Sequence, residues 1–137
     1  MIVADTNVIA YLLLPSPHTA LTERLFRADP DWIAPVLWRS ELRNVLALYL
    51  RKSLITLDDA VSLQAEAEAL FQDKEFEVAA RDVLALVDRS PCSAYDCEFV
   101  ALAQNFSIKL VTMDKKVLAA FPETAVSPSS FMAERPG

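Results

Sequence analysis

The sequence predicts an α/β fold in which helices cover both faces of a mostly parallel sheet. Short apolar runs alternate along the chain with longer segments whose apolar residues recur at helical spacing. Strands that are buried on both faces have such continuous apolar runs. With 137 residues, 53% of them hydrophobic, the chain has the length and composition of one globular domain. We therefore expect a single domain over residues 1–137, with about five short strands in a three-layer α/β/α sandwich.

The first half of the chain contains two predicted strands and four predicted helices. Residues 1–4 form an apolar strand that ends at Asp5, and a helix over residues 6–13 follows until Pro15 stops it. A second helix spans residues 19–28, a turn covers residues 29–31, and a second strand covers residues 32–34. Pro35 can serve as an early residue of a long helix that runs to residue 50, and a further helix spans residues 57–71.

The second half continues the alternation. A third strand is predicted over residues 76–79 and a helix over residues 81–89, which Ser90 and Pro91 break. A helix over residues 95–104 precedes a β-branched strand at residues 108–112. A short helix at residues 115–121, a strand at residues 124–126 and a terminal helix from Pro128 complete the chain. With only one glycine in the sequence, the turns must be made mostly by Pro, Asp, Asn and Ser.

Composition excludes several classes of protein. No apolar run approaches the roughly 18 residues that a membrane span needs, and the N-terminus lacks the features of a signal peptide. We therefore expect no membrane association and a cytoplasmic location. Cys92 and Cys97 have no second cysteine pair and only His18 to complete a zinc site, so we interpret them as reduced thiols.

Four acidic residues carry the chemical prediction: Asp5, Glu41, Asp96 and Asp114. Each falls at the carboxyl end of a predicted strand or in a helical turn nearby, and a parallel sheet brings those ends to one edge, where ligands bind. Such a cluster of negative charges is tolerable only if cations neutralise it, and hard divalent cations such as Mg²⁺ or Mn²⁺ prefer oxygen ligands. One or two ions would support hydrolysis of a phosphodiester by an activated water.

Helix capping is the simpler explanation for some of these residues. Acids favour the first turn of a helix, so Asp96 taken alone is better explained as a cap, and the same holds for Glu41. Asp5 and Asp114 each leave an apolar strand and are stronger candidates. Four coincident placements are less probable than any single one, so both explanations remain open on the residues alone.

The motifs resemble those of the PIN domain, the nuclease fold of VapC-type toxins in prokaryotic toxin–antitoxin pairs. The opening IVADTNVIAYLL resembles the family's first strand with its DTN motif, and APVLWRSELRNVLALYLRK resembles the segment with the second acid. SAYDCEFVALAQ and KLVTMDKKVL resemble the third and fourth acidic motifs, and VSPSSFM resembles the usual C-terminal segment. The resemblance covers nearly the whole chain.

The resemblance implies an Mg²⁺- or Mn²⁺-dependent endoribonuclease, generally a homodimer, that is held inactive by a VapB-like antitoxin. The four acids would then be the catalytic and metal-binding residues. Thr6, Asn7 and Thr112 would be polar supports that orient ligands or water, with helix capping as an equal alternative. Glu98 lies two residues beyond Asp96 and is expected at the solvated surface.

The net charge of −6 at first argues against an RNA substrate. If four of the 19 acidic residues bind metal, the remaining 15 nearly balance the 13 basic ones. Arg39, Arg43, Lys115 and Lys116 flank the acidic motifs and are weak candidates for RNA contacts, with an ordinary solvated surface as the alternative for each.

Three other classes compete with this interpretation. Aspartyl-phosphate phosphatases resemble DxDxT after the first strand, but Asn7 stands where their second acid would be. Phosphoreceiver modules need an adjacent pair of acids there, and Asp5 is alone. A catalytically inactive PIN-like interaction module is the non-enzymatic alternative, although such a protein would be expected to have lost one or more of the four acids.

Overall fold

The computed structural model describes residues 1–135, which form five strands and eight helices. In chain order these are β1 (Ile2–Ala4), α1 (Thr6–Leu13), α2 (Thr19–Ala28), β2 (Trp32–Pro35), α3 (Trp38–Arg51), α4 (Leu57–Leu70), β3 (Glu75–Phe76), α5 (Ala80–Asp88), α6 (Ala94–Phe106), β4 (Leu110–Val111), α7 (Lys115–Ala120), β5 (Ala125–Val126) and α8 (Pro128–Ala133). None of the helices in this part of the chain is long and apolar enough to cross a membrane.

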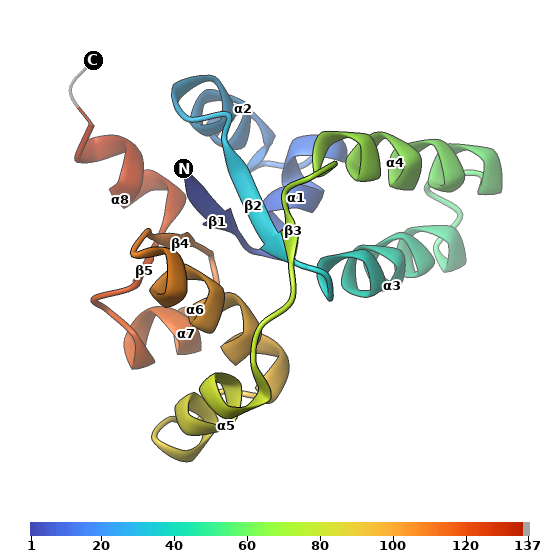
Figure 1. Cartoon of the computed structure of the whole chain (residues 1–137). Coiled ribbons are helices and arrows are strands. Elements are labelled where there is room, and N and C mark those ends of the chain that lie inside the picture. Colours follow the sequence, from blue (N-terminus) through green and yellow to red (C-terminus); the bar gives the residue numbers. More distant parts are fainter. Residues whose placement is uncertain (136–137) are drawn as a thin grey trace.

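The five strands form one sheet in the order β3-β2-β1-β4-β5, and every neighbouring pair is parallel. Figure 1 shows the sheet between two groups of helices. On one face α6 packs across β1, β2 and β4, with α5 against α6 and α7 beside β5. On the other, α1 packs against α2, α3 and α4, and α8 packs against α2. The predicted α/β fold with a parallel five-stranded sheet is confirmed.

Burial explains why these segments adopt their structures. Every residue of β1 and β2 is buried, as expected for central strands covered on both faces. In α6 the five consecutive residues 99–103 are all buried, so the middle of this helix is enclosed on every side and lies in the core, whereas its two ends reach the surface. An enclosed central helix has little freedom to shift, and its N-terminal turn is therefore held firmly at the carboxyl edge of the sheet.

Two boundaries differ from the sequence prediction because of contacts between strands. Pro35 is the last residue of β2 and not part of a helix, since it pairs in register with Phe76 of β3 and α3 begins only at Trp38. The third strand spans Glu75–Phe76, not residues 76–79. The backbone N–H of Ala34 donates to Lys74 O and that of Val36 to Phe76 O, so the ladder ends at Phe76.

The predicted use of serine and aspartate in turns is confirmed at three positions with positive φ. Ser53, Asp73 and Ser107 have φ of 56°, 63° and 55°, in the left-handed region that glycine usually occupies. Ser107 ends α6, and the N–H of Ile108 then bonds back to Ala103 O at 3.0 Å. This closure uses Ile108 in the helix terminus, which shortens the fourth strand to Leu110–Val111.

Candidate active site

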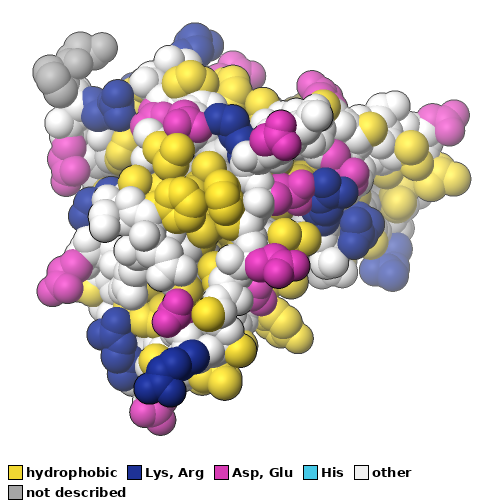
Figure 2. Space-filling model, viewed as in Figure 1, with side chains coloured by type: hydrophobic (Ala, Val, Ile, Leu, Met, Phe, Trp, Pro, Cys, Tyr) yellow, Lys and Arg dark blue, Asp and Glu magenta, His cyan; other side chains and the backbone are white. Residues whose placement is uncertain are grey.

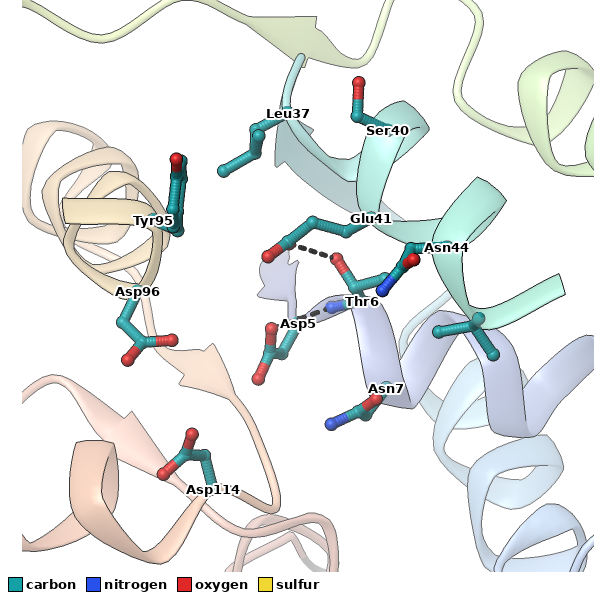
Figure 3. A pocket seen from close by; sticks show the side chains of 11 residues that line it. Asp5, Thr6, Asn7, Leu37, Ser40, Glu41, Asn44, Tyr95, Asp96 and Asp114 are labelled. Carbon is teal, nitrogen blue, oxygen red and sulfur yellow. Dashed lines mark hydrogen bonds between the residues drawn. The ribbon is translucent and has the colours of Figure 1, made fainter. Parts of the chain in front are cut away.

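A pocket of about 500 Å³ opens at the carboxyl edge of the sheet (Figure 3). Asp5 directly follows β1, and Asp114 follows the neighbouring strand β4. The strand order reverses between these two strands, which is where open parallel sheets bind ligands. The pocket is lined by Asp5, Thr6, Asn7, Leu37, Ser40, Glu41, Asn44, Val45, Tyr95, Asp96 and Asp114. The fold thus brings all four predicted acids to one pocket.

Asp5 is fixed by two hydrogen bonds, one to each carboxylate oxygen. Oδ1 accepts from the backbone N–H of Thr6 at 2.8 Å, and Oδ2 accepts from the Thr112 hydroxyl at 2.6 Å. Burial raises the pKa of the Asp5 carboxyl, these two bonds oppose the rise, and the negative charges of Asp96 and Asp114 add to it. The carboxylate is therefore held in one orientation, but its negative charge lowers the stability of the fold.

Thr112 connects Asp5 to Asp114. Its side chain is fully buried, and its hydroxyl donates to Asp5 while accepting from the backbone N–H of Asp114 at 3.0 Å. Asp114 caps α7, because its Oδ1 accepts from the backbone N–H groups of Lys116 and Val117 at 2.9 and 3.2 Å. One buried hydroxyl thus sets the spacing between the acids at the ends of β1 and β4.

Glu41 is held by Thr6 on the other side of the pocket. The buried Thr6 hydroxyl donates to Glu41 Oε1 at 2.7 Å, so this threonine does not cap its own helix. Burial raises the pKa of Glu41, the Thr6 hydrogen bond opposes the rise, and the charges of Asp5, Asp96 and Glu98 add to it. Thr6 therefore supports both acids, Asp5 through its backbone and Glu41 through its side chain.

Asp96 is not the cap of α6. The cap is Ser93, whose hydroxyl accepts from the backbone N–H of Asp96 at 3.1 Å. Within residues 1–135 the Asp96 carboxylate accepts no hydrogen bond. It points into the pocket from the side opposite Glu41 (Figure 3). The capping explanation for Asp96 is wrong, and its carboxylate is left available for a ligand.

The donor set suits a hard cation, although the site is not preassembled as a tight ligand cage. The polar side chains that line the pocket are carboxylates, hydroxyls and the two amides of Asn7 and Asn44, and no Lys or Arg is among its lining residues. In the part of the chain that the structure describes, no three acidic, His or Cys side chains lie close enough to form a ready metal site. Burial is the main cause of the raised pKa values of Asp5 and Glu41, and the negative charges of the neighbouring carboxylates add to it.

The four basic candidates differ in their surroundings. Arg39 is occupied by acids of neighbouring elements: its Nε and Nη2 donate to Glu75 at 2.6 Å, and its Nη1 donates to Glu68 at 3.0 Å. Its role is thus to join α3 to α4 and β3. Arg43 donates to the hydroxyl of Ser40, which lines the pocket, at 3.0 Å. Lys115 and Lys116 are exposed at the start of α7.

The sequence matches the family model of the PIN domain over residues 2–124. The chain belongs to the PIN domain family. Among curated proteins, it is 27% identical over 124 residues to "Ribonuclease VapC3" of Pyrobaculum aerophilum, with 88% of this chain and 95% of that protein covered.

Solved structures of two other proteins share the fold of this PIN domain. FitAcB from Neisseria gonorrhoeae superposes with a TM-score of 0.75 at 21% identity, over 94% of this chain and 99% of that one. PAE2754 from Pyrobaculum aerophilum superposes with a TM-score of 0.70 at 19% identity, over 96% and 93% of the two chains. The recognition of a PIN-type α/β fold from sequence motifs is therefore confirmed.

Sequence reasoning missed several residues of this PIN domain's pocket. Leu37, Asn44 and Val45 lie four residues before and three and four after Glu41, and helical spacing from Glu41 could have identified them. Glu98 is half-buried, not solvated at the surface as expected. It lines a different cavity together with residues of α5, where burial raises its pKa, and its negative charge helps to raise the pKa of Glu41. No sequence signal marked Tyr95, whose exposure depends on the tertiary fold.

Proposed function

We propose that this PIN domain is a metal-dependent endoribonuclease that acts as the toxin of a toxin–antitoxin pair. The observation that carries the proposal is the convergence of Asp5, Glu41, Asp96 and Asp114 on one pocket that no Lys or Arg lines. These acids come from four separate segments of the chain. The name of the relative "Ribonuclease VapC3" supports the choice of RNA as the substrate.

The cofactor we propose is Mg²⁺ or Mn²⁺, as one or two ions held by these four carboxylates. Burial raises the pKa of Asp5 and the charges of Asp96 and Asp114 add to the rise, so a cation in the pocket would offset an unfavourable negative charge that the fold imposes. When bound, a divalent ion supplies Lewis acidity and makes water nucleophilic at neutral pH. The carboxylates would hold the ion, and the ion would recruit the phosphate of the substrate.

The supporting residues have separate tasks in this proposal. Thr112 and Thr6 fix Asp5 in one orientation, and Thr6 also fixes Glu41, so neither acid needs to reorganise when a ligand arrives. Asp96 has no hydrogen bond from residues 1–135 and can adjust to the ligand. Asn7 lies exposed at the pocket wall, where its amide would contact water or the substrate.

The RNA backbone would lie across Arg43, Lys115 and Lys116. Arg43 reaches the pocket rim through Ser40, and the two lysines follow Asp114 directly. We do not assign Arg39 to RNA, because Glu75 and Glu68 already satisfy its guanidinium.

The proposed partners are a VapB-like antitoxin and a second copy of the chain, in the cytoplasm. The α3–α4 hairpin projects away from the sheet (Figure 1), and hydrophobic side chains gather at its end in Figure 2. Leu54, Leu57 and Val61 are more than half exposed there. Exposed apolar clusters of this kind commonly mark protein interfaces.

The alternative function is a catalytically inactive interaction module. The complete set of four acids argues against it, because an inactive module would be expected to have lost one or more of them.

The deciding experiment is cleavage of a panel of structured and single-stranded RNAs with Mg²⁺, Mn²⁺ or EDTA. Asp5→Asn, purified identically, controls for contaminating nucleases, and Asp58→Asn is the matched variant because Asp58 is exposed on α4 outside the pocket. We expect metal-dependent cutting by wild type and Asp58→Asn, and none by Asp5→Asn. Calorimetric Mn²⁺ titration tests the cofactor separately. A folded protein that neither cuts RNA nor binds Mn²⁺ would favour the inactive module.

A further inference from the structure

Tyr95 is an exposed aromatic residue at the mouth of the acidic pocket. It is the second residue of α6, directly before Asp96, and 62% of its surface is accessible to solvent. Figure 3 shows its ring on the α6 side of the pocket, with Leu37 reaching toward it from the start of α3. The two apolar side chains therefore flank the entrance, beside the acids.

The fold makes little use of the Tyr95 side chain. Within residues 1–135 its ring pairs with no other aromatic ring, and its hydroxyl makes no hydrogen bond. It is not among the buried core residues, nor among the partly buried ones that pack on the core. Other aromatic residues, such as Trp38 and Phe71, lie fully buried with their ring centroids 4.9 Å apart. A large apolar ring that folding leaves exposed at a cleft is free to bind a ligand.

The electrostatics of the pocket limit how it can hold a nucleic acid. Four carboxylates line it and no Lys or Arg does, so its own side chains repel a phosphate backbone. Recognition by the pocket wall must therefore use uncharged contacts. Unpaired RNA bases make such contacts by stacking on aromatic side chains, which are worth about 1–3 kcal/mol per base.

We infer that Tyr95 is a substrate-positioning residue on which one unpaired base stacks, with Leu37 closing the other side of the slot. The inference rests on the proposed nuclease function and adds one residue that would contact a base of the substrate beside the acids. Because Tyr95 adjoins Asp96, the stacked base belongs to a nucleotide next to the phosphodiester held by the acids. A paired base cannot enter the slot, so a duplex is a poor ligand.

The test measures binding without cleavage. The probe is a single-stranded oligoadenylate that contains 2-aminopurine, whose fluorescence reports stacking, with the oligoadenylate–oligouridylate duplex as the comparison. Titrations are made in Ca²⁺ at several salt concentrations, and the RNA is checked for integrity afterwards. The proteins are wild type, Tyr95→Ala, Tyr95→Phe, Lys115→Ala and Phe106→Ala, the last being a 39% exposed aromatic at the far end of α6.

We expect Tyr95→Ala to weaken single-strand binding by about 5- to 150-fold and to abolish the fluorescence change. Tyr95→Phe and Phe106→Ala should behave as wild type. Tyr95→Ala should leave the salt dependence unchanged, whereas Lys115→Ala should lower the slope by about 0.7. Unchanged melting temperature in Tyr95→Ala would exclude a structural cause.

Three results would overturn the inference. If wild type binds the oligonucleotide and Tyr95→Ala binds it equally, stacking is wrong and the nuclease proposal is untouched. If wild type cleaves RNA of the panel but ignores the oligoadenylate, a sequence-tolerant base slot is also wrong. If wild type neither binds nor cleaves any RNA, the nuclease proposal is wrong, and so is the base slot that rests on it.

Discussion

The hydroxyl of Thr112 is the contact on which the geometry of the candidate site depends most, and Thr112→Val tests it with almost no change of shape. Valine keeps the volume of the fully buried side chain and removes only the hydroxyl. Asp5 loses its 2.6 Å hydrogen bond, and the backbone N–H of Asp114 loses its 3.0 Å acceptor. Both changes affect residues at the carboxyl edge of the sheet.

The magnitude follows from the two lost bonds. A hydrogen bond to a charged group contributes about 1.5–3 kcal/mol, and a buried N–H left unpaired costs about 1 kcal/mol or more. We therefore expect Thr112→Val to lower the free energy of unfolding by roughly 2.5–4 kcal/mol at pH 7. The Thr112 bond lowers the pKa of Asp5, so its removal raises that pKa further. The loss should shrink as the pH falls and the Asp5 carboxyl becomes protonated.

The assay is urea denaturation in EDTA at pH 7.5 and pH 5, followed by circular dichroism. Thr22→Val is the matched control, because Thr22 is equally buried but donates at 2.8 Å to the neutral carbonyl of His18. It should cost about 0.5–1.5 kcal/mol at either pH. The double variant Asp5→Asn/Thr112→Val should reveal a coupling of about 1.5–3 kcal/mol. A loss no larger than that of Thr22→Val, and equal at both pH values, would refute the reasoning.

Three further predictions concern stability and are measured by the same denaturation assay in EDTA. The pKa of Asp5 is raised in the folded state, so its negative charge lowers the stability of wild type as the pH rises above the usual carboxyl range. The free energy of unfolding of Asp5→Asn relative to wild type should therefore increase from pH 4 to pH 7. A difference between the two proteins that does not change with pH would contradict this. Arg39 lowers the pKa of Glu75, so the ionised Glu75 stabilises the fold at neutral pH, and this stabilisation is lost as the pH falls through that lowered pKa. Glu75→Gln should therefore have a lower free energy of unfolding than wild type at pH 7, and the difference should disappear in acid. Ser107 has φ of 55°, and Ser107→Gly should stabilise by roughly 0.5 kcal/mol, because relief of the left-handed strain exceeds the entropy that glycine loses; a destabilised variant would show that the strain is absent.

Local sequence signals were sufficient for much of the fold and for the identities of the candidate ligands. The apolar runs at residues 1–4 and 32–34 predicted buried strands because central parallel strands are apolar on both faces. The acids that follow β1 and β4 could be recognised because an acidic residue within a few positions of the end of such a run lies at the carboxyl edge of the sheet. Helical spacing placed Asp96 in a first turn and Glu41 near the start of its helix, and the structure has both in first turns. Each of these predictions depends on neighbours only a few residues away.

Tertiary structure decided what each side chain contacts, because those partners lie far apart in the chain. Pro35 ends a strand because Phe76 pairs with it, and the Arg39 guanidinium is bound to Glu75 instead of lining the pocket. Thr112 reaches Asp5 across 107 positions of sequence. Local patterns determine which conformation a segment prefers and which acids reach the edge of the sheet. The order of the strands and the packing of the helices then determine which of those side chains meet, and they leave the ring of Tyr95 exposed beside them.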